Sequence, residues 1–197
     1  MKLGAKEKVY SILGFRDRLS SDQLKNDDKG TLTEPTDDEL SDEDIESQLK
    51  IAKNFIVEGK VEESIEPLLE IIKRRPNHHE SNSLVGALLL GLKQYSFAER
   101  FLYSAVLLSN WTDVVSVVNL AESLKQSGDI ELSRKTIIKS RETIISSQNA
   151  SNESLAMIGE ALGDSFYLTG NYSLAADLFL EVALIRRTSV ESWVSIQ

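Results

Sequence analysis

The residues that could do chemistry in this 197-residue chain are two adjacent histidines, a glycine-containing stretch and many carboxylates. His78 and His79 follow Pro76, and neighbouring side chains on a turn rarely converge on one metal ion; the chain also has no cysteine to complete a zinc site. The stretch GEALGDS at residues 159–165 lacks the lysine with which a phosphate-binding loop reaches a nucleotide. No two carboxylates form a recognisable acid and base pair. We therefore expect no catalytic residue, no cofactor and no metal site, and we place both histidines on a solvated turn.

The net charge of −9 is unevenly distributed along the chain. Residues 1–20 carry +3, residues 21–44 carry −8 and residues 45–197 carry −4. Affinity for nucleic acid comes largely from Lys and Arg that displace counterions from phosphates, so this balance predicts no nucleic-acid partner. The chain has no cysteine, no secretory signal and no apolar run of membrane-spanning length, which together favour a cytoplasmic protein.

Two segments precede the main helical part of the sequence. Residues 1–20 form a short basic segment with the apolar spacing of an amphipathic helix, and membrane contact is expected only through residues 1–18; a frayed terminus or loose packing on the main domain are the alternatives. Residues 21–44 are acidic and poor in large apolar residues, which predicts a disordered linker. Within it, Thr36 and Ser41 precede acidic residues as in acidophilic kinase sites. We regard them as candidate phosphosites that would act through partner recognition.

From residue 45 onward, apolar residues recur at the three-to-four spacing of helices, and the segment repeats itself. One column of matching residues has separations of 34, 35, 42 and 34, and consists of Ile51, Val85, Leu120, Leu162 and Ile196. A small residue follows each of the first four members of this column, namely Ala52, Gly86, Ala121 and Gly163. We expect these small residues where two paired helices approach closely. Stacking of the pairs should then bury one continuous core.

This period and these columns resemble the tetratricopeptide repeat (TPR) family. The first unit contains GKVEESIEPLLEIIKRRP and ends at a proline, and the last complete unit contains LGDSFYLTGNYSLAADLF. The resemblance implies an all-α fold, an α-solenoid coiled as a right-handed superhelix whose first helices line the concave face. It implies four tetratricopeptide repeats over residues 45–187 and the start of a truncated fifth repeat over residues 188–197, where Trp193 lies 34 residues after Gly159. A C-terminal cap is the alternative for this last stretch.

Three features depart from the family pattern. Lys93 occupies a turn position where glycine is usual. Pro67 lies inside an expected helix and should bend it. An insertion around residues 145–154 lengthens the third step of the repeat to 42 residues, so we expect the third and fourth units to meet at an altered angle.

The resemblance also implies a peptide-binding groove, because outward positions of the first helices contact peptides in this family. The matching positions in this chain are Leu49, Lys53, Ile56, Ser83, Ala87, Leu90, Val118, Glu122, Lys125, Glu160, Asp164 and Tyr167. This surface is apolar, with acid toward its C-terminal half, so we expect a protein or peptide partner with apolar and basic residues. The carboxylate clamp with which some members grip chaperone C-terminal tails is not matched. Over the last three units only Asn119 has a required residue type, and we expect no chaperone-tail binding.

The leading hypothesis is therefore a non-enzymatic protein–protein interaction module or scaffold that binds a peptide segment in its concave groove. The alternative is the N-terminal targeting region of a longer protein, such as a group-transferase enzyme, whose catalytic domain is missing from this chain. A third hypothesis is a solenoid that associates with itself, which predicts that the measured mass rises with concentration.

Overall fold

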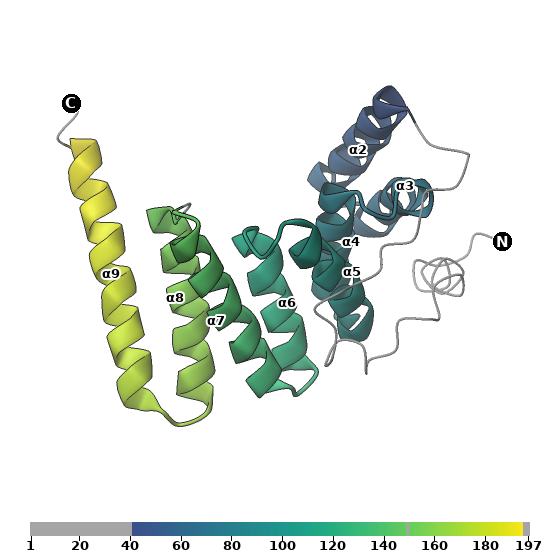
Figure 1. Cartoon of the computed structure of the whole chain (residues 1–197). Coiled ribbons are helices and arrows are strands. Elements are labelled where there is room, and N and C mark those ends of the chain that lie inside the picture. Colours follow the sequence, from purple (N-terminus) through teal and green to yellow (C-terminus); the bar gives the residue numbers. More distant parts are fainter. Residues whose placement is uncertain (1–40, 149, 195–197) are drawn as a thin grey trace.

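The computed structural model describes residues 41–148 and 150–194 of the chain. This part of the chain contains eight helices and no strand: α2 (Asp42–Val57), α3 (Val61–Arg74), α4 (His79–Gly91), α5 (Tyr95–Leu108), α6 (Val114–Gln126), α7 (Ile130–Ser146), α8 (Asn152–Leu168) and α9 (Tyr172–Val194). Consecutive helices pack as four pairs, α2 with α3 through α8 with α9, and the pairs stack one after another (Figure 1). The basic segment expected over residues 1–20 and the candidate phosphosite Thr36 lie outside the described residues.

Helix α2 begins within the acidic segment that was expected to be a linker up to residue 44. α2 starts at Asp42 because the Ser41 side chain caps it, its Oγ accepting a hydrogen bond from the Asp44 N–H at 3.1 Å. Asp42, Glu43 and Asp44 occupy the first turn, where negative charge interacts favourably with the helix dipole. Residues 41–44 are therefore a cap and a first helical turn, and the expected linker boundary at residue 44 was wrong.

Within a pair, the turn between the helices contains a residue with left-handed backbone conformation. Gly59, Gly128 and Gly170 have φ angles of 73°, 95° and 79° in three of these turns. The second pair has Lys93 in the same place, with a φ angle of 58°. A side chain with a Cβ atom is sterically strained in this conformation, whereas glycine is not.

Paired helices approach closely at the small residues of the repeat pattern. A Cβ atom at Gly86 would lie 2.5 Å from Leu102 Cγ on α5, and one at Gly163 would lie 2.6 Å from Phe179 Cε1 on α9. Both distances are well below ordinary contact, so a larger side chain would push the helices apart. The predicted role of these two glycines is confirmed.

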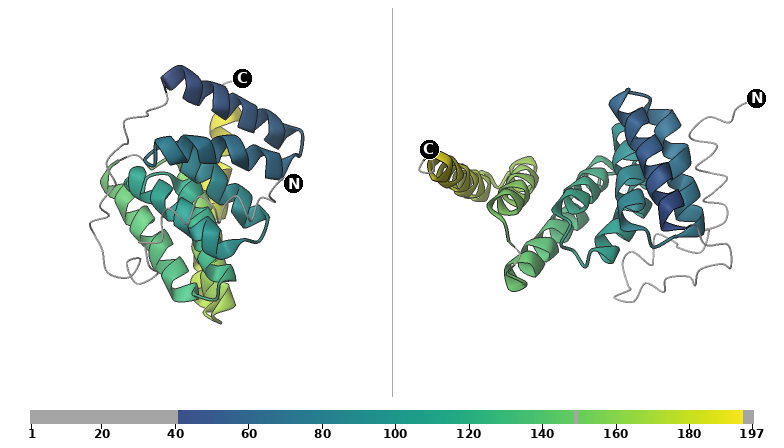
Figure 2. Two further views of the ribbon diagram at one scale, coloured as in Figure 1. Left: turned by 90° about the vertical axis from the view of Figure 1, so that its right-hand side faces the viewer. Right: turned by 90° about the horizontal axis from the view of Figure 1, so that it is seen from above.

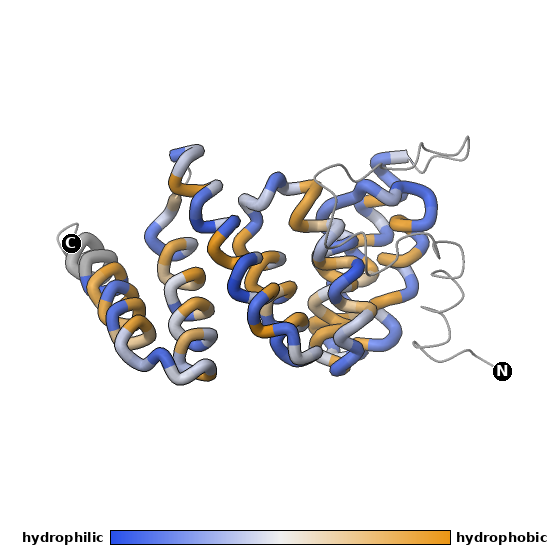
Figure 3. Tube along the Cα trace, turned by 60° about the horizontal axis from the view of Figure 1, so that its bottom comes forward, coloured by the Kyte–Doolittle hydropathy of each residue, from blue (hydrophilic) through white to orange (hydrophobic). Residues whose placement is uncertain are grey.

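The buried side chains form two clusters, whereas one continuous core was expected. The larger cluster joins the first two pairs to α6 and includes Leu68 and Phe101. The smaller joins α6, α7 and α8 and includes Ile137 and Ile158. The two clusters meet at α6, and several of the buried residues on the following helix α7, such as Ser140, are polar. Apolar residues recur along each helix between polar ones (Figure 3), and α6 contributes to both clusters.

The first helices lie on the inner side of the stack. α4 contacts α6 and α6 contacts α8, while no comparable contact joins successive second helices among the described residues. An ion pair of 2.7 Å between Lys53 Nζ and Glu80 Oε1 links α2 to α4. The chain is an all-α solenoid with the predicted right-handed superhelical architecture, and α2 and α9 lie at its opposite ends (Figure 2).

Two helices continue through positions where the sequence predicted a new repeat or a bend. α9 runs without a break from Tyr172 to Val194, so residues 188–194 extend the fourth pair and do not open a separate fifth unit. No Gly, Pro or Asn occurs between residues 172 and 194 to end the helix, and the boundary expected at residue 188 was wrong for the described residues. α3 likewise continues from Val61 to Arg74 through the buried Pro67.

Candidate functional site

The candidate surface is the inner face, which we define as the solvent-facing side chains of α2, α4, α6 and α8 at and beside the predicted groove positions. Most of the residues predicted there are at least partly exposed: Lys53, Ile56, Ser83, Ala87, Leu90, Val118, Glu122, Lys125, Glu160, Asp164 and Tyr167. Contacts between successive first helices place these residues on neighbouring elements. A hydrogen bond of 2.7 Å between the hydroxyls of Ser83 and Ser116 holds α4 against α6.

Leu49 does not belong to the inner face. Its side chain is only 8% exposed and is part of the larger core cluster. Ile45, Leu49 and Ala52 lie at four- and three-residue spacing and form the buried side of α2. The assignment of Leu49 to the groove was therefore wrong.

The C-terminal part of the inner face is acidic and aromatic. Glu153, Glu160 and Asp164 lie at seven- and four-residue spacing along one side of α8. Glu153 and Asp164 are exposed, whereas Glu160 is half-buried and its Oε1 lies 2.7 Å from a guanidinium nitrogen of Arg186 on α9. Tyr167, on the same side of the helix, is 59% exposed. Two carboxylates and a large ring therefore face solvent together on α8.

The Tyr167 ring is held in place by the turn that follows its helix. Tyr172, the first residue of α9, packs edge-on against it with the ring centroids 5.3 Å apart. Such aromatic pairs gain attraction beyond the area they bury. The turn between α8 and α9 thus presents a supported aromatic surface beside the carboxylates of α8.

Glu122 is less available to a partner than its position in the sequence indicated. Its carboxylate pairs with Lys125 on the next turn of α6 and accepts a hydrogen bond from Gln126 Nε2 at 2.8 Å. Burial acts to raise the pKa of Glu122, but the hydrogen bonds from Lys125 and Gln126, together with the Lys125 charge, outweigh it and lower the pKa. Glu122 is therefore held ionised with its charge offset locally by Lys125.

The two layers of helices differ in charge. The first helices carry nine acidic and three basic residues, a net charge of −6. The second helices carry ten acidic and nine basic residues, a net charge of −1. Acid is concentrated on α2 and α8, and the apolar Ala87, Leu90 and Val118 lie on the helices between them.

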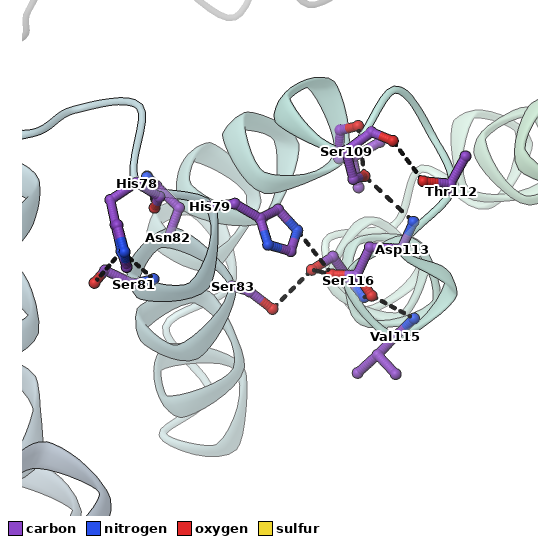
Figure 4. Close-up of polar contacts among 11 residues, drawn as sticks. His78, His79, Ser81, Asn82, Ser83, Ser109, Thr112, Asp113, Val115 and Ser116 are labelled. Atoms are coloured by element: carbon purple, nitrogen blue, oxygen red, sulfur yellow. Dashed lines mark hydrogen bonds and ion pairs between the residues drawn. The ribbon is translucent and has the colours of Figure 1, made fainter. Parts of the chain in front are cut away.

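The two histidines are structural residues, and their placement on a solvated turn was wrong. His78 caps α4: its Nδ1 accepts a hydrogen bond from the Ser81 N–H at 3.3 Å (Figure 4). His79 reaches the third pair, where its Nε2 lies 3.0 Å from Asp113 Oδ2 without the alignment of a hydrogen bond. Asp113 itself caps α6 and accepts a hydrogen bond from Ser116 Oγ at 2.5 Å. An Asp three residues before Ser116, ahead of an apolar run, is the sequence signal that could have identified this cap.

The His78 cap depends on a neutral ring, because a protonated Nδ1 cannot accept a hydrogen bond. Burial lowers the pKa of His78; the Glu80 charge opposes this effect, and the charges of Arg75 and His79 add to it. The fold therefore favours the form of His78 that caps α4.

Groups of metal ligands and membrane spans are also lacking in the described part of the chain. No three His, Asp or Glu side chains gather there as metal ligands. No helix among residues 41–148 and 150–194 combines the length and apolar character needed to cross a membrane.

No protein-family model and no curated protein sequence matches the chain, but solved structures do. MamA (residues 41 to the end) from Desulfovibrio magneticus RS-1 is 20% identical, with 75% of this chain and 78% of that chain covered and a TM-score of 0.62. The nearly identical TPR-like repeats of a kinesin light chain protein from Podosopora anserina are 17% identical over 95% of this chain and 89% of that chain, with a TM-score of 0.64. The chain has a tetratricopeptide-type fold.

The tetratricopeptide fold accounts for the four helix pairs and for the position of the first helices on the inner side of the stack. A second MamA structure, from MSR-1, covers 94% of this chain and 91% of its own at 16% identity, with a TM-score of 0.59. At such identities the similarity establishes the tetratricopeptide fold alone.

Proposed function

We propose that the chain is a non-enzymatic protein-interaction module or scaffold that binds a peptide segment along its inner face. The main support for the proposal is the difference in charge between the two layers of helices. The first helices have a net charge of −6 and the second helices a net charge of −1. Folding of a solenoid does not require this difference, because side chains on the outer surface of either layer face solvent. An acidic inner layer is suited to attracting a basic partner.

The residues of the inner face define the chemistry of that partner. Leu90 and Val118 on α4 and α6 offer apolar surface, and Tyr167 on α8 offers an exposed ring of the kind that often dominates binding energy. Glu153 and Asp164 are exposed carboxylates beside it. The partner is therefore a segment with apolar side chains over α4 and α6 and Lys or Arg over α8, where the charges fix orientation and association rate more than affinity.

Selection from a displayed library of random peptides tests this proposal with a defined probe. We expect the selected peptides to combine basic and apolar residues, and the tightest of them to lose at least about tenfold in affinity for the double variant Glu153→Lys with Asp164→Lys. A matched control, Glu63→Lys with Glu142→Lys, makes the same change in net charge on the second helices. Glu63 lies in the first turn of α3 as Glu153 lies in that of α8, and all four residues are exposed.

The two double variants distinguish binding at the inner face from general attraction by net charge. A loss confined to the α8 variant supports the inner face as the binding surface. An equal loss in both variants would show that net charge alone attracts the peptides. Selection of peptides without basic residues, bound equally by all three proteins, would also refute the proposal.

A further inference from the structure

The pairs of the solenoid meet through fixed positions on their first helices. Ser123 of α6 donates a hydrogen bond to the Tyr95 carbonyl of the preceding pair at 2.9 Å. Ser165, at the same repeat position on α8, accepts one from Arg134 Nε of its preceding pair at 3.2 Å. The side of each first helix that contains this position therefore faces the pair before it.

Among the described residues, no pair lies in front of this side of α2. Ile51 is 41% exposed, whereas the residues at its position in the later pairs, Val85, Leu120 and Leu162, are 0%, 2% and 4% exposed. Ser47 and Asn54, which lie four residues before and three residues after Ile51, are exposed as well. We call Ser47, Ile51 and Asn54 the front stripe.

The second helix at the other end of the solenoid shows the complementary feature. Leu180 of α9 is 60% exposed, whereas Leu69, its counterpart on α3, is 1% exposed. Ala183 is exposed too, and its counterparts Ile72 and Val106 are 2% and 0% exposed. We call Ala176, Leu180, Ala183 and Leu184 the back stripe; all four are exposed apolar residues at helical spacing on one side of α9.

We propose that the front stripe of one copy of this chain packs against the back stripe of another, so that copies associate head to tail. Within the chain a second helix packs against the next first helix three times, between α3 and α4, α5 and α6, and α7 and α8. The apolar form of this contact is seen at α3, whereas on α7 the counterpart of Leu180 is Ile138, which is 37% exposed. The two stripes thus occupy the positions that pack together at the junction of α3 with α4, where Leu69 and Ile72 are buried. Neither stripe contains a charged residue, so their contact leaves no buried charge unpaired.

The position of the stripes determines the type of assembly. α2 and α9 lie at opposite ends of the stack (Figure 2), so the contact joins two different surfaces and is heterologous. Each added copy leaves a front stripe free at one end and a back stripe free at the other. Association should therefore not stop at a dimer.

The contact is between one helix and another, and interfaces of this small size are weak. Sedimentation velocity should be measured from about 5 μM to about 500 μM, a range that covers weak association. We expect the weight-average mass of the full chain to rise with concentration beyond that of a dimer. A constant monomer mass over this range would overturn the proposal.

Two single variants identify the surfaces. Ile51→Glu disables the front stripe and Leu180→Glu disables the back stripe, and both positions are exposed enough for the fold to tolerate the change, which circular dichroism checks. Each variant alone should remain monomeric. An equimolar mixture should form a 1:1 heterodimer that does not grow further, because each variant retains the stripe that the other needs. Val57→Glu is the control, since Val57 is 88% exposed on α2 outside the front stripe.

The single variants and their mixture also distinguish the proposed assembly from a symmetric one. If α9 paired with α9 of a second copy, Ile51→Glu alone would still associate, and the proposal would be wrong. A mixture that stays monomeric while the wild-type chain associates would likewise refute the pairing of the two stripes. This proposal does not depend on peptide binding by the inner face.

Discussion

Gly86 on α4 lies against Leu102 on α5, so closely that a Cβ atom at residue 86 would be 2.5 Å from Leu102 Cγ. Leu102 is completely buried and cannot move aside without disturbing the core. We expect Gly86→Ala to lower the free energy of unfolding by about 1–3 kcal/mol, because overpacking outweighs the better helix propensity of alanine. Urea denaturation measures the effect.

Gly91, at the end of the same helix, is the matched control. A Cβ atom there would meet nothing within 4 Å, and its φ angle is not left-handed. Gly91→Ala should therefore leave stability unchanged or raise it by up to about 1 kcal/mol. Equal effects of the two substitutions would show that close approach at Gly86 does not matter.

Replacement of Lys93 by glycine should stabilise the chain. Lys93 holds a φ angle of 58° in a turn where the other pairs have glycine. Lys93→Gly removes the strain of a Cβ atom in this conformation and should raise the free energy of unfolding by about 1 kcal/mol. The same denaturation experiment checks this, and a loss of stability would contradict the account of these turns.

Arg134 holds the fourth pair to the third. Its guanidinium donates to Ser165 Oγ at 3.2 Å and Thr169 Oγ1 at 2.9 Å, and lies 4.6 Å from the centre of the Phe166 ring. We expect Arg134→Ala to weaken this junction by about 1–3 kcal/mol, and Arg134→Lys to restore little, because an ammonium group cannot form the same fork of hydrogen bonds. Hydrogen exchange should then accelerate in α8 and α9 more than in α2 to α5. A uniform acceleration along the chain would contradict a separable fourth pair.

The cap at His78 predicts a dependence of stability on pH. Because the folded chain lowers the pKa of His78 from its ordinary 6.5, the unfolded chain takes up a proton first as the pH falls, and stability is lost below about pH 6.5. His78→Asn keeps a capping acceptor that does not titrate. The stability difference between wild type and variant should therefore shift in favour of the variant between about pH 7.5 and about pH 5.5. A difference that does not change with pH would remove His78 as the cause.

The fold was predictable from the sequence because its signal is repeated. The column of Ile51, Val85 and their equivalents marks the same buried position in each unit, and Gly86 and Gly163 mark close approaches within pairs. The contact of His79 with Asp113 was not predictable, because residues 34 apart meet there only through the stacking of two pairs. Leu49 was wrongly assigned to the groove because the assignment relied on the family position alone. The spacing of Ile45, Leu49 and Ala52 already indicates that Leu49 lies on the buried side of α2.

The end of the solenoid shows the limit of repeat matching. SVESWVSIQ matches the start of a first helix by position, but residues 188–194 have no residue that would end the helix already in progress. The helix α9 therefore continues through residues 188–194, although the repeat pattern predicted a new helix there. The availability of individual inner-face side chains could not be predicted from the sequence either. The charge of Glu122, for example, is offset by an ion pair with Lys125 that depends on how the two side chains lie on α6.

The most direct test of the inner face as a peptide-binding surface is to map a selected peptide by amide chemical-shift changes on the full, isotope-labelled chain. The largest changes should lie on the inner face, around Ala87 of α4, Val118 of α6 and Asp164 and Tyr167 of α8. Changes confined to α3, α5, α7 and α9 would contradict this prediction, because the peptide would then bind the outer layer.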